Sequence, residues 1–305
     1  MSRFRFVDRE RARYPVNLMC RLLMVSRSGF YAWAARGPSV RALTDEVLTQ
    51  MIREVHAASR ATYGAPRVHA ELADNGVHVG RKRVARLMRC AGLAGVSRRR
   101  TRLGTGTQRG LQVLAPADLV GRQFRAERPD QLWVADVTYV PTAAGWLYLA
   151  VVLDVFSRRA VGWSMDSTRK TELVVGAVRM ATHRRRGEGR PGVLGVIHHS
   201  DQGSEYTSHL LERELKRIGA LASTGSVADC YDNAMAESFF ATVECELFDR
   251  QPGKQFASHA KAKLAIFDYL ETFYNTRRRH SALGYQTPVG YEQHYRATHP
   301  DGQAA

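Results

Sequence analysis

The order of strand-like and helix-like segments from about residue 128 onward most constrains the fold of this chain. Three strand-like runs follow one another, LWVADVTYV, GWLYLAVVLDVFS and RAVGWSMD. The breaks between them, at Gly145 and at Ser157-Arg158-Arg159, predict three consecutive antiparallel strands. Helix, strand, helix, strand and helix patterns come next, and they begin at Thr171, Leu194, Thr207, Leu221 and Asn233. A last long helix is predicted from Phe256 to about Tyr274.

This element order is that of the ribonuclease-H-like fold, in which helices flank a mixed sheet. We therefore expect an α/β core. Asp136 would lie on the central first strand, Asp201 at the end of the fourth strand, and Glu237 on a helix beside them. This fold would therefore bring the three acids near one another. In the sequence, 35 residues separate Asp201 from Glu237.

The segment before this core is predicted to be all-helical. Two short helices lie within VNLMCRLLMVSRSGFYAWAARG, and a long helix runs from about Val40 to Ser59. The run YGAPRVHAELADNGVHVGRKRVARLMRC then gives a helix, a turn and a basic second helix, as in a helix-turn-helix reader of the major groove. The candidate DNA contacts on that second helix are Arg81, Lys82, Arg83, Arg86 and Arg89. The alternative is an ordinary helical hairpin with a solvated basic face.

The distribution of charge favours the DNA-contact interpretation. Residues 1–125 hold 24 Lys and Arg against 8 Asp and Glu, whereas residues 126–305 hold 21 of each. The whole net charge of +16 therefore lies in the N-terminal part, as expected for a nucleic-acid-binding region. No amphipathic helix with a bulky apolar face indicates membrane binding.

Composition and cysteine usage predict a cytoplasmic, nucleoid-associated protein. No run of about 18 apolar residues offers a membrane span, and the basic start lacks the apolar region of a secretory signal. The four cysteines form no CxxC pair, so neither a disulfide framework nor a zinc knuckle is indicated.

The predicted domains follow from these patterns. They are an N-terminal helical segment (1–38), a helix-turn-helix domain (39–97), a basic linker (98–125), the catalytic-type core (126–290) and a tail (291–305). The linker opens with Arg98, Arg99 and Arg100, which can follow a phosphate backbone. Another basic cluster, Arg277, Arg278 and Arg279, either holds DNA phosphates or is a solvated helix end.

Three acids on a basic chain suggest a metal site that acts on phosphates. Two Mg²⁺ ions about 3.5–4 Å apart can neutralise a phosphodiester, activate a nucleophile and stabilise a leaving group. Mg²⁺ prefers hard oxygen ligands, so a few carboxylates suffice. Asp136 on the central strand is the natural bridging ligand, and Asp201 would hold one metal and Glu237 the other. An acid among apolar strand residues, such as Asp136, is costly to bury without a partner.

Two alternatives compete with this choice of ligands. Asp154 also lies in an apolar run, either as a ligand or as a structural partner of Arg158 or Arg159. The pair His198-His199 is either a set of metal ligands or, more often in such a position, two strand-end residues bonded to backbone.

The motifs quoted above resemble those of a known family. WVADVTYV with GWLYLAVVLDVFSRRAVGW, then HHSDQGSEYTS, then CYDNAMAESFFATVECEL, are similar to the DDE transposases of bacterial insertion sequences, in the IS-three group, which are relatives of retroviral integrases. The resemblance covers about residues 14 to 292, including YGAPRV, GRKRVARLMR and YNTRRRHSALGYQTPVGYE.

The resemblance implies a function and a set of partners. Asp136, Asp201 and Glu237 would be catalytic metal ligands for two Mg²⁺ ions, with Mn²⁺ as a substitute. The implied reaction frees a 3′-OH at an element end, and that hydroxyl then attacks a second phosphodiester. Double-stranded DNA would be the substrate, and a homo-oligomer on DNA is expected because two ends are joined.

Two departures from the family pattern qualify this expectation. Many relatives carry Lys or Arg seven positions after the catalytic Glu, where this chain has Glu244. No heptad run occurs in residues 1–60, so the chain resembles the second-frame product, which would act with or fused to a first-frame product. Two other functions remain open, namely a nuclease that cuts without joining and a DNA-binding regulator or inactive remnant.

Overall fold

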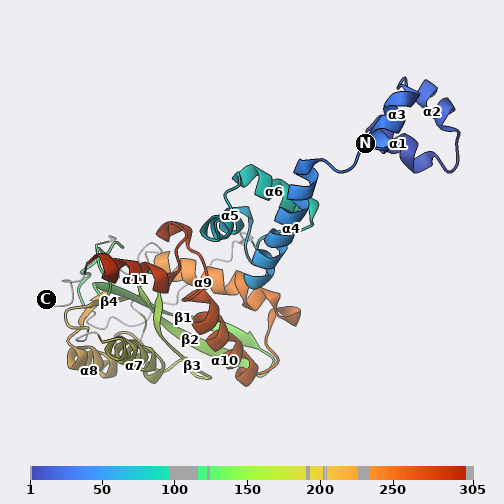
Figure 1. The fold of residues 1–305 in the computed structure, drawn as a ribbon. Helices are drawn as coiled ribbons and strands as arrows, with labels where there is room; N and C mark the ends of the chain where they lie inside the picture. Colours follow the sequence, from blue (N-terminus) through green and yellow to red (C-terminus); the bar gives the residue numbers. More distant parts are fainter. Residues whose placement is uncertain are drawn as a thin grey trace.

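The computed structural model describes residues 2–96, 116–121, 124–189, 193–201, 203, 205–225 and 234–299. Three parts follow one another along the chain: a small group of helices at the N-terminus, a second helical unit, and a larger α/β unit (Figure 1). Among the described residues, no helix has both the length and the apolar character needed to cross a membrane.

A five-stranded mixed sheet forms the centre of the α/β unit. The strands are β1 (Leu132–Thr142), β2 (Gly145–Asp154), β3 (Ala160–Asp166), β4 (Ile197–Ser200) and β5 (Leu221–Thr224). Their order across the sheet is β3-β2-β1-β4-β5. The first three pair antiparallel, and β4 and β5 continue in parallel beyond β1. The predicted ribonuclease-H-like fold class is confirmed, with β1 in the centre.

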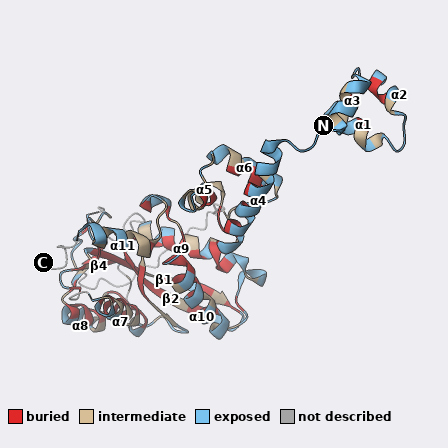
Figure 2. Cartoon of the chain, in the orientation of Figure 1, coloured by how far each residue is buried: buried red, intermediate tan, exposed pale blue. Residues whose placement is uncertain are grey.

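Helices cover both faces of this sheet because side chains alternate along each strand. On one face, Trp133 and Ala135 pack with the helices α7 (Thr171–Gly187) and α8 (His209–Ile218). On the other face, Leu132 and Val134 belong to the core that includes α9 (Ala234–Glu246) and α10 (His259–Asp268), and Figure 2 shows these strands buried between the two layers.

A glycine sets the close packing of α7 on the sheet. A Cβ atom at Gly162 of β3 would lie 2.1 Å from the carbonyl oxygen of Ala177 and 2.6 Å from the backbone nitrogen of Ala181. Backbone atoms cannot move aside as a flexible side chain can, so this position has room only for glycine.

The N-terminal helices have a small core of their own. They are α1 (Arg3–Glu10), α2 (Val16–Leu22) and α3 (Arg27–Ala34). Their buried side chains are Val7, Met19, Cys20 and Phe30. Ser26 caps α3 by accepting a hydrogen bond from the Gly29 backbone N–H at 2.8 Å, as predicted. The basic helix α1 is not apparent in the sequence because Val7 is its one buried residue.

The second helical unit has the predicted helix–turn–helix order. It consists of α4 (Val40–Ala58), α5 (Ala65–Asp74) and α6 (Arg81–Cys90). Ile52, Val68 and Val84, one from each helix, are fully buried. Their core is continuous with that of the α9 side of the sheet, so the helix-turn-helix unit packs against the α/β unit.

Specific polar contacts hold these two units together. The Tyr63 hydroxyl donates to the carbonyl of Arg277 at 3.0 Å and accepts from the backbone N–H of Arg279 at 2.8 Å. Arg67 of α5 forms an ion pair with Glu246, at the end of α9, at 3.3 Å. Helix α9 therefore contacts the helix-turn-helix unit through its last turn, and Glu237 lies in its first turn.

Glu246 is the centre of a buried charge cluster at this contact. It accepts two hydrogen bonds from Arg278, both at 2.7 Å, and one from Tyr269 at 2.8 Å. Burial alone would raise the pKa of Glu246, but the bonds and charge of Arg278 outweigh it and hold this pKa below its usual value of 4.5.

A pH-dependent contribution to stability follows from Glu246. Because its pKa is lower in the folded state, the pair stabilises the fold above pH 4.5, and this contribution is lost as the pH falls below that value. At pH 7 we expect Glu246→Gln to lower the free energy of unfolding by about 3–5 kcal/mol, since it leaves Arg278 without its buried partner. Urea unfolding should show the difference from wild type shrinking toward pH 3. A difference that stays constant with pH would contradict the assignment.

Two segments near the C-terminus differ from the sequence-based predictions. The last long helix is α10 followed by a π-helical turn, Tyr269–Tyr274, rather than one α-helix. The segment predicted as a tail from residue 291 belongs instead to α11 (Pro288–Thr298). Glu292 of α11 is 1% exposed, so this helix is part of the folded core. The predicted domain boundaries otherwise stay predictions.

Candidate active site

Three elements carry the predicted acids toward one end of the sheet. Asp136 lies on β1, Asp201 directly follows β4, and Glu237 lies in the first turn of α9. Strands β1 and β4 are neighbours in parallel register, and α9 packs against β1. The sheet order therefore places three acids that are distant in sequence around the centre of the fold.

Asp136 has the most perturbed environment of the three. Burial raises its pKa to about 7, and the negative charges of Asp201 and Glu237 add to the rise. The backbone N–H of Val137, 2.7 Å from its Oδ1, and the charge of Arg169 act in the opposite direction. A half-buried carboxylate that two other acids repel is a position where a cation would relieve repulsion.

Asp201 lies at the surface next to an ion pair. Although the residue is exposed, the atoms around its carboxylate withdraw it from water and raise its pKa. The backbone N–H of Gly203, 3.2 Å from Oδ1, and the charge of Arg169 lower it. Arg169 itself is paired with Glu205, at 2.5 Å between Nε and Oε1.

Helix α9 buries one side and exposes the acid. Helical spacing predicts Phe239 and Val243 on one face and Glu237, Ala241 and Glu244 on another. Phe239 and Val243 do lie in the core and Glu237 and Glu244 are exposed, whereas Ala241 is buried. Asp229 and Asp232, which could cap the start of this helix, lie outside the described residues.

The three carboxylates fit a hard divalent cation in chemistry, since all their donor atoms are oxygens. They interact electrostatically, as the raised pKa of Asp136 indicates. Within the part of the chain that the structure describes, however, no three His, Cys, Asp or Glu side chains are close enough together to form a metal site. The acids therefore interact electrostatically but do not form a set of metal ligands in the described structure. Their role as ligands stays a prediction.

The competing carboxylate, Asp154, has a structural environment. It is fully buried and accepts hydrogen bonds from the backbone N–H groups of Asp130 at 2.7 Å and Ser157 at 2.9 Å. Its buried cationic neighbour is Arg185 at 3.5 Å, rather than the predicted Arg158 or Arg159. These partners account for Asp154 without a metal.

The competing histidines are also buried on β4. Burial lowers the pKa of His198 to about 4, so its ring is neutral at pH 7. His199 pairs through Nδ1 with the hydroxyl of Ser223 at 2.9 Å. The interpretation as strand-end residues is the one that these contacts favour.

Sequence reasoning missed three residues beside the acids: Arg169, Glu205 and Tyr206. Arg169 lies between β3 and α7, and its charge acts on both Asp136 and Asp201. The buried Tyr206 hydroxyl has no hydrogen-bond partner within the described chain, and its pKa is raised by burial and by the nearby acids. No sequence period marks these positions, although Glu205 and Tyr206 belong to the HHSDQGSEY motif itself.

The basic residues of α6 fall into two groups. Arg83 and Arg86 pair with Asp45 of α4 at 2.7 and 2.6 Å. Arg81, Lys82 and Arg89 are exposed, and the structure gives them no ion pair with any described residue. The exposed group is therefore the better candidate for contact with phosphates.

Salt dependence of DNA binding distinguishes the two groups. Replacing one phosphate-contacting residue, as in Arg89→Ala, should reduce the slope of log K against log salt concentration by about 0.9. Arg86→Ala should change the slope less, because its charge is partly neutralised by Asp45. Fluorescence anisotropy with a generic duplex measures both slopes. Equal slopes for wild type and Arg89→Ala would contradict this assignment.

The structure tests one of the two other basic clusters that were predicted to contact DNA. Arg278 is buried against Glu246, and Arg279 pairs with Asp74 at 2.7 Å and with Glu71. Those pairings argue against the predicted phosphate contacts for these two residues and leave Arg277, which is exposed, as the candidate. The linker residues Arg98, Arg99 and Arg100 lie outside the described part of the chain.

Family comparisons agree with this arrangement. Residues 126–230 and 219–288 match the family model described as an integrase core domain, and residues 42–101 match an HTH-like domain. The transposase for insertion sequence element IS629 of Shigella sonnei is 38% identical over 96% of this chain and 96% of its own length. Transposase InsF for insertion sequence IS3fB of Escherichia coli is 36% identical, over 94% of this chain and 97% of its own.

Two solved structures are similar at a lower level. One is titled as the HTLV-2 integrase catalytic core domain in complex with magnesium, with a TM-score of 0.39 and 16% identity over 55% of this chain and 99% of that one. The other is a simian T-cell lymphotropic virus intasome, with a TM-score of 0.44 and 14% identity over 79% and 74% of the two chains. At these TM-scores the structural similarity is low, and the fold assignment comes from the sheet order and the family models.

The sheet, the acids around it and the attached helix-turn-helix unit define an enzyme of the transposase and integrase class, with a DNA-binding region. Within that class the chain belongs to the insertion-sequence transposases that include those of IS629 and IS3.

Proposed function

We propose that the chain catalyses Mg²⁺-dependent cleavage of a DNA 3′ end and transfer of that end to a second DNA strand. The proposal is supported by the positions of Asp136 on β1, Asp201 after β4 and Glu237 in the first turn of α9, together with the raised pKa of the half-buried Asp136. The family membership supports the same reaction.

Each acid has a distinct position from which to act. Asp136 is held on the rigid central strand, so its carboxylate is a fixed reference for the reacting phosphate. Asp201 would act from the end of β4 and Glu237 from the first turn of α9. Asp136, Asp201 and Glu237 would hold the divalent cations, which when bound supply charge neutralisation and an activated nucleophile.

The remaining residues orient the substrate. Arg169 lies beside Asp136 and Asp201, where its guanidinium would offset the charge of a phosphate oxygen and limit repulsion from the carboxylates. The exposed face of α6 would hold duplex DNA, and the polar contacts of Tyr63 and Arg67 fix that unit relative to α9. Two DNA ends require more than one copy of the chain, so assembly on DNA is part of the proposal, as is cooperation with a first-frame product.

End cleavage tests this function. The flanking repeats of the element, once sequenced, supply a labelled duplex, which is incubated with the protein and Mg²⁺ or with EDTA. We expect a cleaved strand and a joined product with Mg²⁺ and neither with EDTA, and we expect both products to vanish with Asp201→Asn. Binding without any product from wild type would favour the DNA-binding regulator instead, and cleavage without joined product would favour a nuclease.

A further inference from the structure

An exposed group of aromatic rings lies on the hairpin formed by β1 and β2. This hairpin aromatic patch consists of Tyr139, Trp146 and Tyr148. Tyr139 is opposite Tyr148 in the antiparallel register, and their ring centroids are 5.2 Å apart. Tyr139 also meets Trp146 edge to face at 5.8 Å. Trp146 is 56% exposed and Tyr139 47% exposed, so large aromatic surface faces solvent here.

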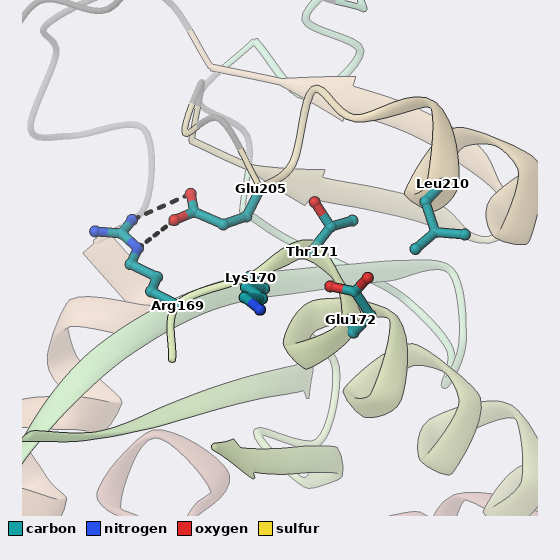
Figure 3. A pocket seen from close by; sticks show the side chains of 6 residues that line it. All are labelled: Arg169, Lys170, Thr171, Glu172, Glu205 and Leu210. Carbon is teal, nitrogen blue, oxygen red and sulfur yellow. Dashed lines mark hydrogen bonds and ion pairs between the residues drawn. The ribbon is translucent and has the colours of Figure 1, made fainter. Parts of the chain in front are cut away.

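A cation lies against this patch. The Arg169 guanidinium is 5.9 Å from the centroid of the Tyr139 ring and donates to its hydroxyl at 3.1 Å. Glu205 holds Arg169 from the other side, and Figure 3 shows this pair at the edge of a hollow that Lys170 and Leu210 also line. The hollow has a volume of ≈ 420 Å³ and is wide open to solvent.

The patch is close to the acids of the candidate active site. Tyr139 follows Asp136 by three residues on β1, so the two side chains leave the strand on opposite faces, and Arg169 is the residue that connects them. The same Arg169 that contacts Tyr139 acts electrostatically on Asp136 and Asp201. The link between the patch and the acids is therefore Arg169, which donates to the Tyr139 hydroxyl and lies beside Glu205.

We propose that the hairpin aromatic patch stacks an unpaired nucleotide of the DNA substrate next to the reacting phosphodiester, with Arg169 and Lys170 facing its phosphates. This inference rests on the proposed function for the position of the phosphodiester. Aromatic side chains bind nucleobases through their flat faces, which are accessible in unpaired nucleotides and covered in a duplex. The basic neighbours complement the phosphate charge. The patch thus favours a DNA end whose last nucleotides are unpaired.

The test compares a forked DNA end with the same end fully paired. Affinities are measured by fluorescence anisotropy in EDTA, so that no cleavage occurs and binding is independent of catalysis. Wild type should bind the forked end more tightly. Trp146→Ala should reduce that preference about 5- to 150-fold, the range for loss of one base–aromatic stack. Trp146→Phe should retain most of it, because the ring is kept.

Controls separate this effect from other causes. Tyr14→Ala removes an aromatic ring of equal exposure, 56%, between α1 and α2, and should leave the preference unchanged. Because the preference is measured as binding in EDTA, a preference that depends on Trp146 stands even if no joined product is ever formed. An unchanged preference in a folded Trp146→Ala protein would overturn the proposal. If that variant instead altered self-association in sedimentation, the patch would be an interface between copies, which also overturns it.

Discussion

Asp136→Asn is expected to lower the single-turnover rate of DNA end cleavage by about 10³-fold or more. Metal-assisted charge stabilisation contributes several kcal/mol to phosphoryl transfer, and each 1.36 kcal/mol is a factor of ten in rate. The charges of Asp201 and Glu237 both raise the pKa of Asp136, and Asp136 lies on β1, the central strand of the sheet. The rate is measured with excess enzyme on a labelled end in Mg²⁺.

Two controls make this result specific to catalysis. Asp166→Asn changes an exposed acid at the end of β3 and should leave the rate near that of wild type. The Asp136→Asn protein should bind DNA as wild type does and should unfold at no lower temperature, since asparagine replaces a charge that is costly to bury. A cleavage rate within tenfold of wild type would remove Asp136 from the catalytic set.

Arg185→Met is expected to lower the free energy of unfolding by about 3–5 kcal/mol, the cost of breaking a buried ion pair by removing one partner. Arg185 is fully buried on α7 and contacts Glu292 of α11 through two hydrogen bonds of 2.7 Å. It also pairs with Asp130 at 2.8 Å and with Asp154 at 3.5 Å. Without the guanidinium, buried carboxylates would be left close together, and α11 would be held to the end of α7 by the pair of Arg296 with Glu188 at 3.1 Å.

Arg186→Met is the matched control, because Arg186 is the next residue on the same helix and is exposed. Its effect on urea unfolding should stay within about 0.5 kcal/mol. If Arg185→Met were as stable as this control, the buried network would not hold α11 as described. Cleavage activity measured well below the unfolding temperature should be retained, since Arg185 contacts none of the three candidate acids in the described structure.

The sequence was sufficient to predict the core fold. Alternating and apolar runs specify β1 to β3, and the acids at Asp136 and Asp201 follow from their place on or after such runs. Glu237 was singled out by its motif and its spacing from Asp201, and the separation of buried and exposed faces on α9 agrees with that choice. The confirmed fold class and family membership therefore depend on local periodicity together with motif order.

Long-range ion pairs could not be predicted in the same way. Arg278 and Arg279 were predicted to be either DNA contacts or a solvated helix end, because nothing local indicates that Glu246 and Asp74 are their partners. Asp154 likewise pairs with Arg185, which is 31 positions away in the sequence, and not with the nearby Arg158 or Arg159. The segment of α11 was predicted to be a tail because nothing local indicates that Glu292 forms a buried ion pair with Arg185. Pairings of this kind are set by the packed fold, not by residue spacing.

The central claim is that this chain joins DNA by attack of a 3′-hydroxyl. The most direct test uses a pre-cleaved element end that carries either a 3′-OH or a 3′-deoxy terminus, incubated with the protein, a target duplex and Mg²⁺. We expect joined product from the 3′-OH end alone, and no joined product from either end with Glu237→Gln. Equal products from both termini, or no joining from the 3′-OH end by a protein that cleaves the intact end, would contradict the claim.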